Sequence, residues 1–170
     1  MFEIGEYVVK ANSGICKIEE IIELDLLDNG NLESYYVVVP IDNKSSKLFV
    51  PINTSANTLR QVINETQAWD IINSISLIPE PSFENEKVRE AKYKEAIKSC
   101  EPTALIGILK SMHTRKKLRS QQGKKNFAID EHFFKLAENS LYSELSFATG
   151  QDQQHIGKII TDIIENNGEK

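Results

Sequence analysis

Short apolar segments alternate with polar turns over the first 52 residues of the chain. Four segments, at residues 6–10, 15–24, 34–41 and 47–52, are rich in Val, Ile, Tyr and Phe, a composition typical of β-strands. Asn29-Gly30 and residues 43–46 separate them as turns, and Gly5 and Gly14 lie where tight bends are needed. Four or five short antiparallel strands in a segment of this length predict a small SH3- or Tudor-like barrel.

The apolar spacing becomes helical after Pro51. Trp69, Ile72 and Ile75 recur every three residues, which predicts a helix over residues 66–75 with Asn64 as its N-cap. Pro79 and Pro81 then interrupt the chain, and we place a junction near them.

Four further helices are expected over residues 84–98, 103–118, 130–148 and 153–165. The third and fourth carry apolar stripes at three- and four-residue spacing, and Asp130 is the expected N-cap of the third. The predicted fold is therefore α+β, with an antiparallel barrel followed by an all-α bundle. We divide the chain into the barrel (1–55), a connecting helix and linker (56–82) and a basic helical domain (83–170).

Charge is distributed unevenly along the chain. Residues 87–125 hold 12 Lys or Arg and 3 acidic residues, a net charge of +9. The rest of the chain holds 8 basic and 22 acidic residues, a net charge of −14, so the total of −5 conceals a strongly basic segment. Such polarisation favours a polyanion as partner over a merely solvated charged face.

The basic segment predicts contact with the phosphates of duplex DNA. Basic residues at a helix C-terminus also complement the helix dipole, but that role does not explain six positive charges within residues 115–125. Few side chains are arranged to read base edges, so we expect backbone contacts with little sequence preference. The candidate DNA-binding residues are Lys87, Arg89, Lys92, Lys94, Lys98, Arg115, Lys116, Lys117, Arg119, Lys124 and Lys125.

The residue patterns do not favour an enzyme. The three histidines are scattered without metal-ligand spacing, and no phosphate loop, dinucleotide fingerprint or nucleophile elbow is present. We therefore expect no cofactor, no metal and no small-molecule substrate. Cys16 and Cys100 lie in dissimilar segments and are expected to be free thiols of a cytoplasmic protein. The sequence shows neither a signal peptide nor a membrane-spanning stretch.

Several segments together resemble the CarD/CdnL family of bacterial transcription regulators. FEIGEYVV (2–9) and SGICKI (13–18) are similar to the family's opening motifs, and residues 35–38 and 49–52 resemble its third and last strands. Four segments of the helical part are also similar to segments of family members: REAKYKEA (89–96), RKKLR (115–119), GKK (123–125) and LYSEL (141–145). The similarity runs through essentially the whole chain in order.

This resemblance implies a non-enzymatic transcription factor. The family's N-terminal module, shared with the transcription-repair coupling factor, adds a strand edge to the β subunit of RNA polymerase. Its C-terminal module contacts DNA at the upstream edge of the transcription bubble, and many members stabilise the open promoter complex. By position, the polymerase-binding residues are Leu24, Lys47, Leu48, Phe49 and Val50.

Two departures from the family pattern matter. Arg89 stands where the best-known members carry a tryptophan that wedges into the minor groove. Leu24 and Phe49 stand where some members carry polymerase-binding arginines. The polymerase contact is therefore expected to be more apolar, and open-complex stabilisation does not follow from the resemblance alone.

Two alternatives remain open from the sequence. The chain could be a protein–protein adaptor whose basic helices only interact with solvent, or an RNA-associated factor. The RNA reading is disfavoured because Tyr93 is the only aromatic residue of residues 87–125. Salt-sensitive DNA binding by the helical half would exclude the adaptor.

Overall fold

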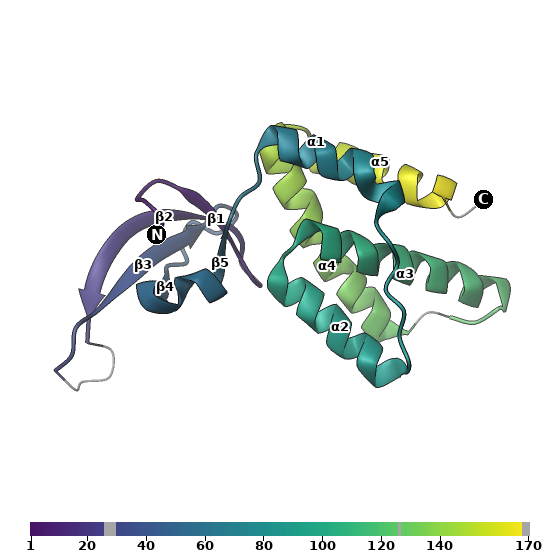
Figure 1. Cartoon of the computed structure of the whole chain (residues 1–170), viewed down its shortest axis with the longest axis horizontal. Helices are drawn as coiled ribbons and strands as arrows, with labels where there is room; N and C mark the ends of the chain where they lie inside the picture. Colours follow the sequence, from purple (N-terminus) through teal and green to yellow (C-terminus); the bar gives the residue numbers. More distant parts are fainter. Residues whose placement is uncertain (26–29, 126, 168–170) are drawn as a thin grey trace. The chain divides into compact units, whose positions relative to one another are not determined.

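The structure is a computed structural model, and it describes residues 1–25, 30–125 and 127–167 (Figure 1). The chain divides into two compact units, Met1–Val62 and Ile63–Lys170. The first contains a β-sheet and the second contains α-helices, so the predicted α+β class is confirmed. Residues 56–82, for which we expected a connecting segment, contribute to both units. Within the parts of the chain described here, no helix is long and apolar enough to cross a membrane.

The first unit is a five-stranded antiparallel sheet with the strand order β4-β3-β2-β1-β5. Figure 1 shows β2 and β3 as two long strands with the shorter strands beside them. The strands are β1 (Tyr7–Lys10), β2 (Gly14–Leu24), β3 (Glu33–Pro40), β4 (Leu48–Pro51) and β5 (Leu59–Gln61). A 3-10 helix, η1 (Ile52–Asn57), connects β4 to β5. The predicted turn at Asn29-Gly30 lies only partly in the described residues, because Asn29 is outside them.

The four expected strands are confirmed, whereas closure into a barrel is not. β4 and β5 stand at opposite ends of the strand order, and no pairing joins them among the described residues. The sheet is curved rather than closed: the register between β2 and β3 shifts between Ile18 and Glu20, which marks a bulge that bends the strand. β5 was not expected, and it pairs with β1.

One face of the sheet buries the core of the first unit. The core residues Val8, Cys16, Ile18, Tyr36, Val38, Val50 and Leu59 come from all five strands. Phe2 closes one end of this core: its backbone N–H donates to the Tyr36 hydroxyl at 2.9 Å, and the two rings meet edge to face. The N-terminal segment before β1 is therefore part of the folded unit.

Five α-helices form the second unit, and a short 3-10 helix follows the first of them. They are α1 (Glu65–Ser74), η2 (Ile75–Leu77), α2 (Glu86–Ser99), α3 (Pro102–Gln121), α4 (Ala128–Thr149) and α5 (Gln153–Asn167). All five α-helices were expected from the sequence, and Asn64 caps α1 as predicted, in a reciprocal capping box with Gln67. The prediction that Asp130 caps the third of the longer helices is wrong. α4 begins earlier, Phe127 occupies the N-cap position, and Asp130 lies in the first turn.

The helical core draws on every helix of the second unit. Tyr93, Leu105, Leu109, Leu141, Leu145, Ile156 and Ile160 are almost completely buried in it. Trp69 is partly buried against this core, in agreement with its expected packing role. Two buried polar side chains bind backbone groups of residues before and after α1. The Glu144 carboxylate accepts a hydrogen bond from the Ile63 backbone N–H at 3.1 Å, and the Lys110 ammonium donates to the carbonyls of Ile75 and Ile78 at 3.1 and 2.6 Å.

Candidate functional site

The β4 edge is the first candidate surface. β4 pairs with β3 on one side and stands at the end of the strand order, so its other side has no partner strand among the described residues. Unpaired N–H and C=O groups at a sheet edge can accept a strand from another protein. Leu48 and Val50 face the core, whereas Phe49 faces the opposite way and leaves 48% of its surface exposed.

The face of the sheet that carries Phe49 combines apolar and charged groups. Glu20, Val37 and Phe49 follow one another across β2, β3 and β4 in the register, so their side chains project from the same face. The Lys47 ammonium lies 3.4 Å from the Glu20 carboxylate, and both side chains are about half exposed. Phe49 is therefore an exposed aromatic group flanked by an ion pair at the edge of the sheet.

Leu24 lies apart from the other predicted polymerase-binding residues. Leu24 is the last residue of β2, and its partner on β3 is Glu33. The last residue of β4, Pro51, pairs with Tyr35, which lies two positions after Glu33 on β3. Leu24 is partly buried. The structure thus gathers Leu48, Phe49 and Val50 on β4, with Lys47 directly before it, and leaves Leu24 beyond the end of that strand.

The second candidate surface consists of lysines in the helical unit. Eight lysines of the basic segment are exposed, and we call them the exposed lysine set: Lys87, Lys92, Lys94, Lys98, Lys116, Lys117, Lys124 and Lys125. On α2, Lys87, Lys94 and Lys98 share one stripe, because their separations are close to whole helical turns. Lys92 and Lys94 form exposed ion pairs with Glu95 and Glu90, at 3.0 and 2.6 Å. Such exposed pairs are worth about 0–1 kcal/mol, so phosphate could readily replace either carboxylate.

The arginines of the basic segment do not belong to that exposed surface. Arg89 is buried, with 7% of its side chain exposed, and its guanidinium lies 2.5 Å from Glu86 and 3.1 Å from Asp130. Arg115 contacts the same two carboxylates, both at 3.0 Å. These four residues form an ion-pair network that joins α2, α3 and α4. Arg89 therefore does not reach the surface in this fold, which corrects its place among the DNA-facing residues.

Arg119 has a structural role as well. Its guanidinium donates to the Lys125 carbonyl at 2.9 and 2.6 Å and lies over the ring of Phe127, 4.0 Å from the centroid. These contacts hold Lys125 and Phe127 against the end of α3. The sequence could not identify this role, because a basic residue near a helix C-terminus carries no sign of the carbonyl or ring that it will meet.

The buried aromatic group next to the ion-pair network is Tyr93. Its ring packs edge to face with Phe83 and Phe133, and the Arg89 guanidinium lies 5.6 Å from its centroid. Burial raises the pKa of Tyr93, since the phenolate would lose its hydration, and the nearby Arg89 charge opposes part of this shift. Tyr93 is thus a neutral core residue rather than a stacking platform for bases.

No group of histidine, cysteine, aspartate and glutamate residues suited to holding a metal ion occurs among the residues that the structure describes. Cys16 and Cys100 are both buried, and neither forms a disulfide. Burial raises the pKa of Cys16 to about 11, so its sulfur is protonated at neutral pH. The two candidate surfaces are thus a strand edge with an exposed aromatic residue and a set of exposed lysines.

The first unit belongs to the class of small β modules with an edge strand that lacks a partner among the described residues. Residues 2–63 match the family model of the CarD-like/TRCF RID domain. The chain therefore carries a CarD-like RNA polymerase-interacting domain, and the matched residues are essentially those of the first unit. The resemblance noted in the sequence is thus confirmed for this unit. No curated protein matches the chain.

Proposed function

We propose that this protein is a transcription regulator that binds the β subunit of RNA polymerase through β4 and promoter DNA through the helical unit. The observation that carries the proposal is the RNA polymerase-interacting domain, whose edge strand exposes Phe49. Strand pairing supplies backbone hydrogen bonds, and an exposed aromatic residue beside them supplies apolar contact area. The protein acts by binding rather than by catalysis, in the cytoplasm, where its partner operates.

The exposed lysine set supports the DNA part of the proposal. Lysines on long flexible side chains neutralise phosphates without reading bases, so the expected binding is weak, tolerant of sequence and sensitive to salt. Binding near the upstream edge of the bubble would change the stability of the open complex. Since Arg89 is buried, any such effect depends on lysine contacts rather than on a side chain wedged between base pairs.

The polymerase contact can be tested with one substitution on β4. Phe49→Glu places a carboxylate at the exposed edge and should reduce binding to purified RNA polymerase β subunit at least tenfold in an interferometry titration. Ile4→Glu is the matched control, because Ile4 is 61% exposed and lies outside the sheet. This control should bind like the unmodified protein. Binding of Phe49→Glu at unchanged affinity would remove β4 as the polymerase-binding edge.

A further inference from the structure

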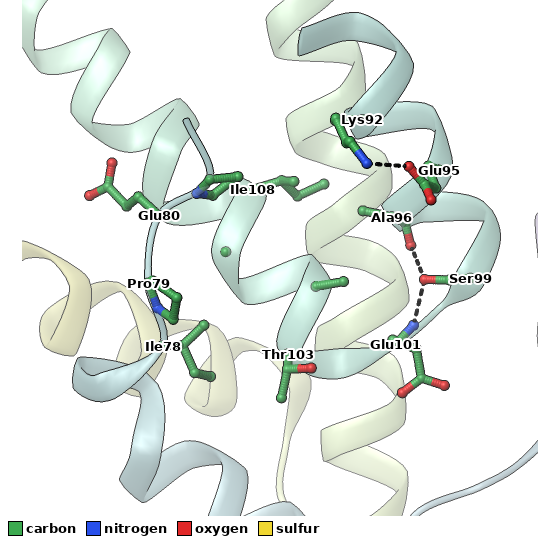
Figure 2. A pocket seen from close by; sticks show the side chains of 13 residues that line it. Ile78, Pro79, Glu80, Lys92, Glu95, Ala96, Ser99, Glu101, Thr103 and Ile108 are labelled. Carbon is green, nitrogen blue, oxygen red and sulfur yellow. Dashed lines mark hydrogen bonds and ion pairs between the residues drawn. The ribbon is translucent and has the colours of Figure 1, made fainter. Parts of the chain in front are cut away.

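A surface groove of about 510 Å³ lies in the helical unit, away from the stripe of α2 that carries Lys87, Lys94 and Lys98. It is lined by α2, by the first half of α3 and by the extended segment 78–81, and Figure 2 shows side chains from all three segments around one space. Its volume falls in the range of about 300–1,000 Å³ that is typical of ligand pockets.

The groove has an apolar floor and a fixed wall. Ala96, Ala104 and Ile108 supply apolar surface, and Gly107 lies where the wall packs against α3. The wall is packed tightly on α3, because a β-carbon at Gly107 would lie 3.3 Å from the Pro79 carbonyl oxygen and 3.5 Å from Pro81. The absence of a side chain at Gly107 therefore allows the segment 78–81 to pack directly on α3 and form this wall.

The rim of the groove is acidic, unlike the lysine surface nearby. Three carboxylates line it, those of Glu80, Glu95 and Glu101, against the single ammonium of Lys92. Lys92 is already paired with Glu95 at 3.0 Å, as Figure 2 shows. A net formal charge of −2 at the rim repels phosphate and complements a basic partner, so the groove and the exposed lysine set suit partners of opposite charge.

The hydrogen-bonding groups around the groove limit how a partner can bind. Pro79 and Pro81 have no backbone N–H, so the extended wall cannot pair with an added strand. The Ser99 hydroxyl donates to the Ala96 carbonyl at 2.8 Å and accepts from the Glu101 N–H at 3.2 Å, contacts that Figure 2 also shows. Recognition therefore depends on side chains placed on the apolar floor and on charges at the rim.

We propose that this groove binds a short amphipathic basic segment of another protein. Apolar side chains of the segment would lie on Ala96, Ala104 and Ile108, and lysine or arginine side chains beside them would meet Glu95 and Glu101. This site is separate from the two surfaces of the proposed function, except that Lys92 belongs to both the rim and the exposed lysine set. It can therefore be tested without RNA polymerase or DNA.

The test uses the full chain and two labelled peptides of matched apolar content. The first carries leucines at helical i, i+3, i+4 and i+7 spacing with lysines at the remaining positions, and the second has glutamate in place of every lysine. Fluorescence anisotropy should show saturable binding of the lysine peptide and at least tenfold weaker binding of the glutamate peptide. The largest amide chemical-shift changes should fall on Thr103, Ala104 and Gly107.

Paired variants locate the binding site. Ala104→Leu fills the groove, and the double variant Glu95→Lys/Glu101→Lys reverses the charge of its rim. Each of these two variants should bind the lysine peptide at least tenfold more weakly than the unmodified protein. Ala91→Leu and Glu90→Lys are the matched controls, because both residues lie on α2 outside the groove lining, and they should leave the affinity unchanged. Circular dichroism should show native helix content for every variant used.

Several results would overturn the proposal. Equal binding of both peptides would remove the role of the acidic rim, and binding of neither peptide would remove the site. Binding that Ala104→Leu leaves unchanged would place the peptide elsewhere. A change in the sedimentation coefficient of the protein alone on Ala104→Leu would identify a second copy of the chain as the occupant instead.

Discussion

Tyr142 lies so close to Gly157 that a β-carbon built at Gly157 would be 2.9 Å from its Cε2 atom. The two residues come from α4 and α5, the last two helices of the chain, and the missing side chain lets them approach closely. Burial raises the pKa of Tyr142, and the Tyr142 hydroxyl donates to the Glu138 carboxylate at 3.2 Å. The ring is thus fixed where it covers Gly157.

This contact predicts that Gly157→Ala destabilises the helical unit. Overpacking of this kind costs about 1–3 kcal/mol, which exceeds the roughly 0.8–1 kcal/mol that alanine gains over glycine in a helix. Thermal unfolding followed by circular dichroism at 222 nm would measure the loss. Lys158→Ala, an exposed neighbour on α5, should change stability little. A Gly157→Ala protein more stable than the original would contradict the close approach.

The ion-pair network predicts that Arg89 contributes to folding rather than to DNA affinity. Arg89→Ala removes the buried partner of Asp130, and truncating one member of a buried pair costs about 3–5 kcal/mol. Because Arg115 still contacts Asp130, we expect about 3 kcal/mol, measured by urea denaturation. Lys94→Ala is the control, since its ion pair is exposed and its loss should change stability by less than about 1 kcal/mol. A fully stable Arg89→Ala protein with weakened DNA binding would restore the original assignment.

The exposed lysine set predicts steeply salt-dependent binding to duplex DNA. Contact with about four phosphates gives a log–log salt slope of about −3.6, at roughly −0.9 per phosphate. Replacing Lys116 and Lys117 together by alanine should flatten the slope by up to about 1.8, if each lysine contacts one phosphate. Fluorescence anisotropy titrations of the DNA at salt concentrations between about 50 and 200 mM would measure both slopes.

A lysine remote from the basic segment provides the comparison for this experiment. Lys158 on α5 is exposed and lies outside residues 87–125, so Lys158→Ala should leave the slope unchanged. A slope near zero for the unmodified protein would rule out phosphate contact by the exposed lysine set. An equal effect of Lys158→Ala would show that binding follows net charge rather than that set.

Cys16 predicts a loss of stability of the sheet unit at high pH. Burial raises the folded-state pKa of Cys16 from 9.0 to about 11, Lys10 opposes the shift, and Asp42 adds to it. A raised folded pKa means that this contribution to stability is complete below pH 9 and is lost as the pH rises through about 11. The urea denaturation midpoint of the sheet unit should fall over this pH interval. The midpoint of the Cys16→Val variant should fall less, because valine has no thiol to ionise.

The same burial predicts thiol protection. Iodoacetamide should leave both cysteines unmodified in the folded protein at pH 8 and should modify two thiols after unfolding, because alkylation requires an accessible thiolate. Rapid alkylation of Cys16 in the folded protein would contradict its buried position. An intermolecular or internal disulfide, seen by mass measurement without reductant, would contradict the free thiols.

The sequence predicted the elements well where apolar residues repeat over several turns or strands. The five α-helices and four of the five strands were expected, although α3 and β3 bury nearly continuous runs rather than periodic sets. β5 was missed because it has three residues and Leu59 is its only buried one, too little for a pattern. Whether the sheet closes into a barrel could not be predicted from the sequence either. Closure depends on bulges and strand length rather than on the alternation of apolar and polar side chains.

The candidate surfaces were predicted less completely, for a different reason. Charge patterns locate basic residues along the chain but do not show which of them will meet a carboxylate from another helix. Arg89 has Glu86 three residues before it, a local hint of pairing, but Asp130 lies 41 positions away in the sequence and reaches Arg89 only through the fold. The apolar groove was not anticipated, since its floor combines small residues from two helices and its wall comes from a loop.

The basic segment divides these roles: its arginines and the buried Lys110 stabilise the fold, whereas its exposed lysines supply surface charge. Its three arginines hold helices and loop together through fixed planar contacts, whereas its eight exposed lysines make few contacts within the protein. Substitution of the lysines can therefore vary the electrostatic field of the surface over a wide range while the helical scaffold stays the same. Natural variation or engineering at the lysines can therefore change the affinity for a charged partner with little effect on stability. Changes at the arginines would instead alter the stability of the helical unit.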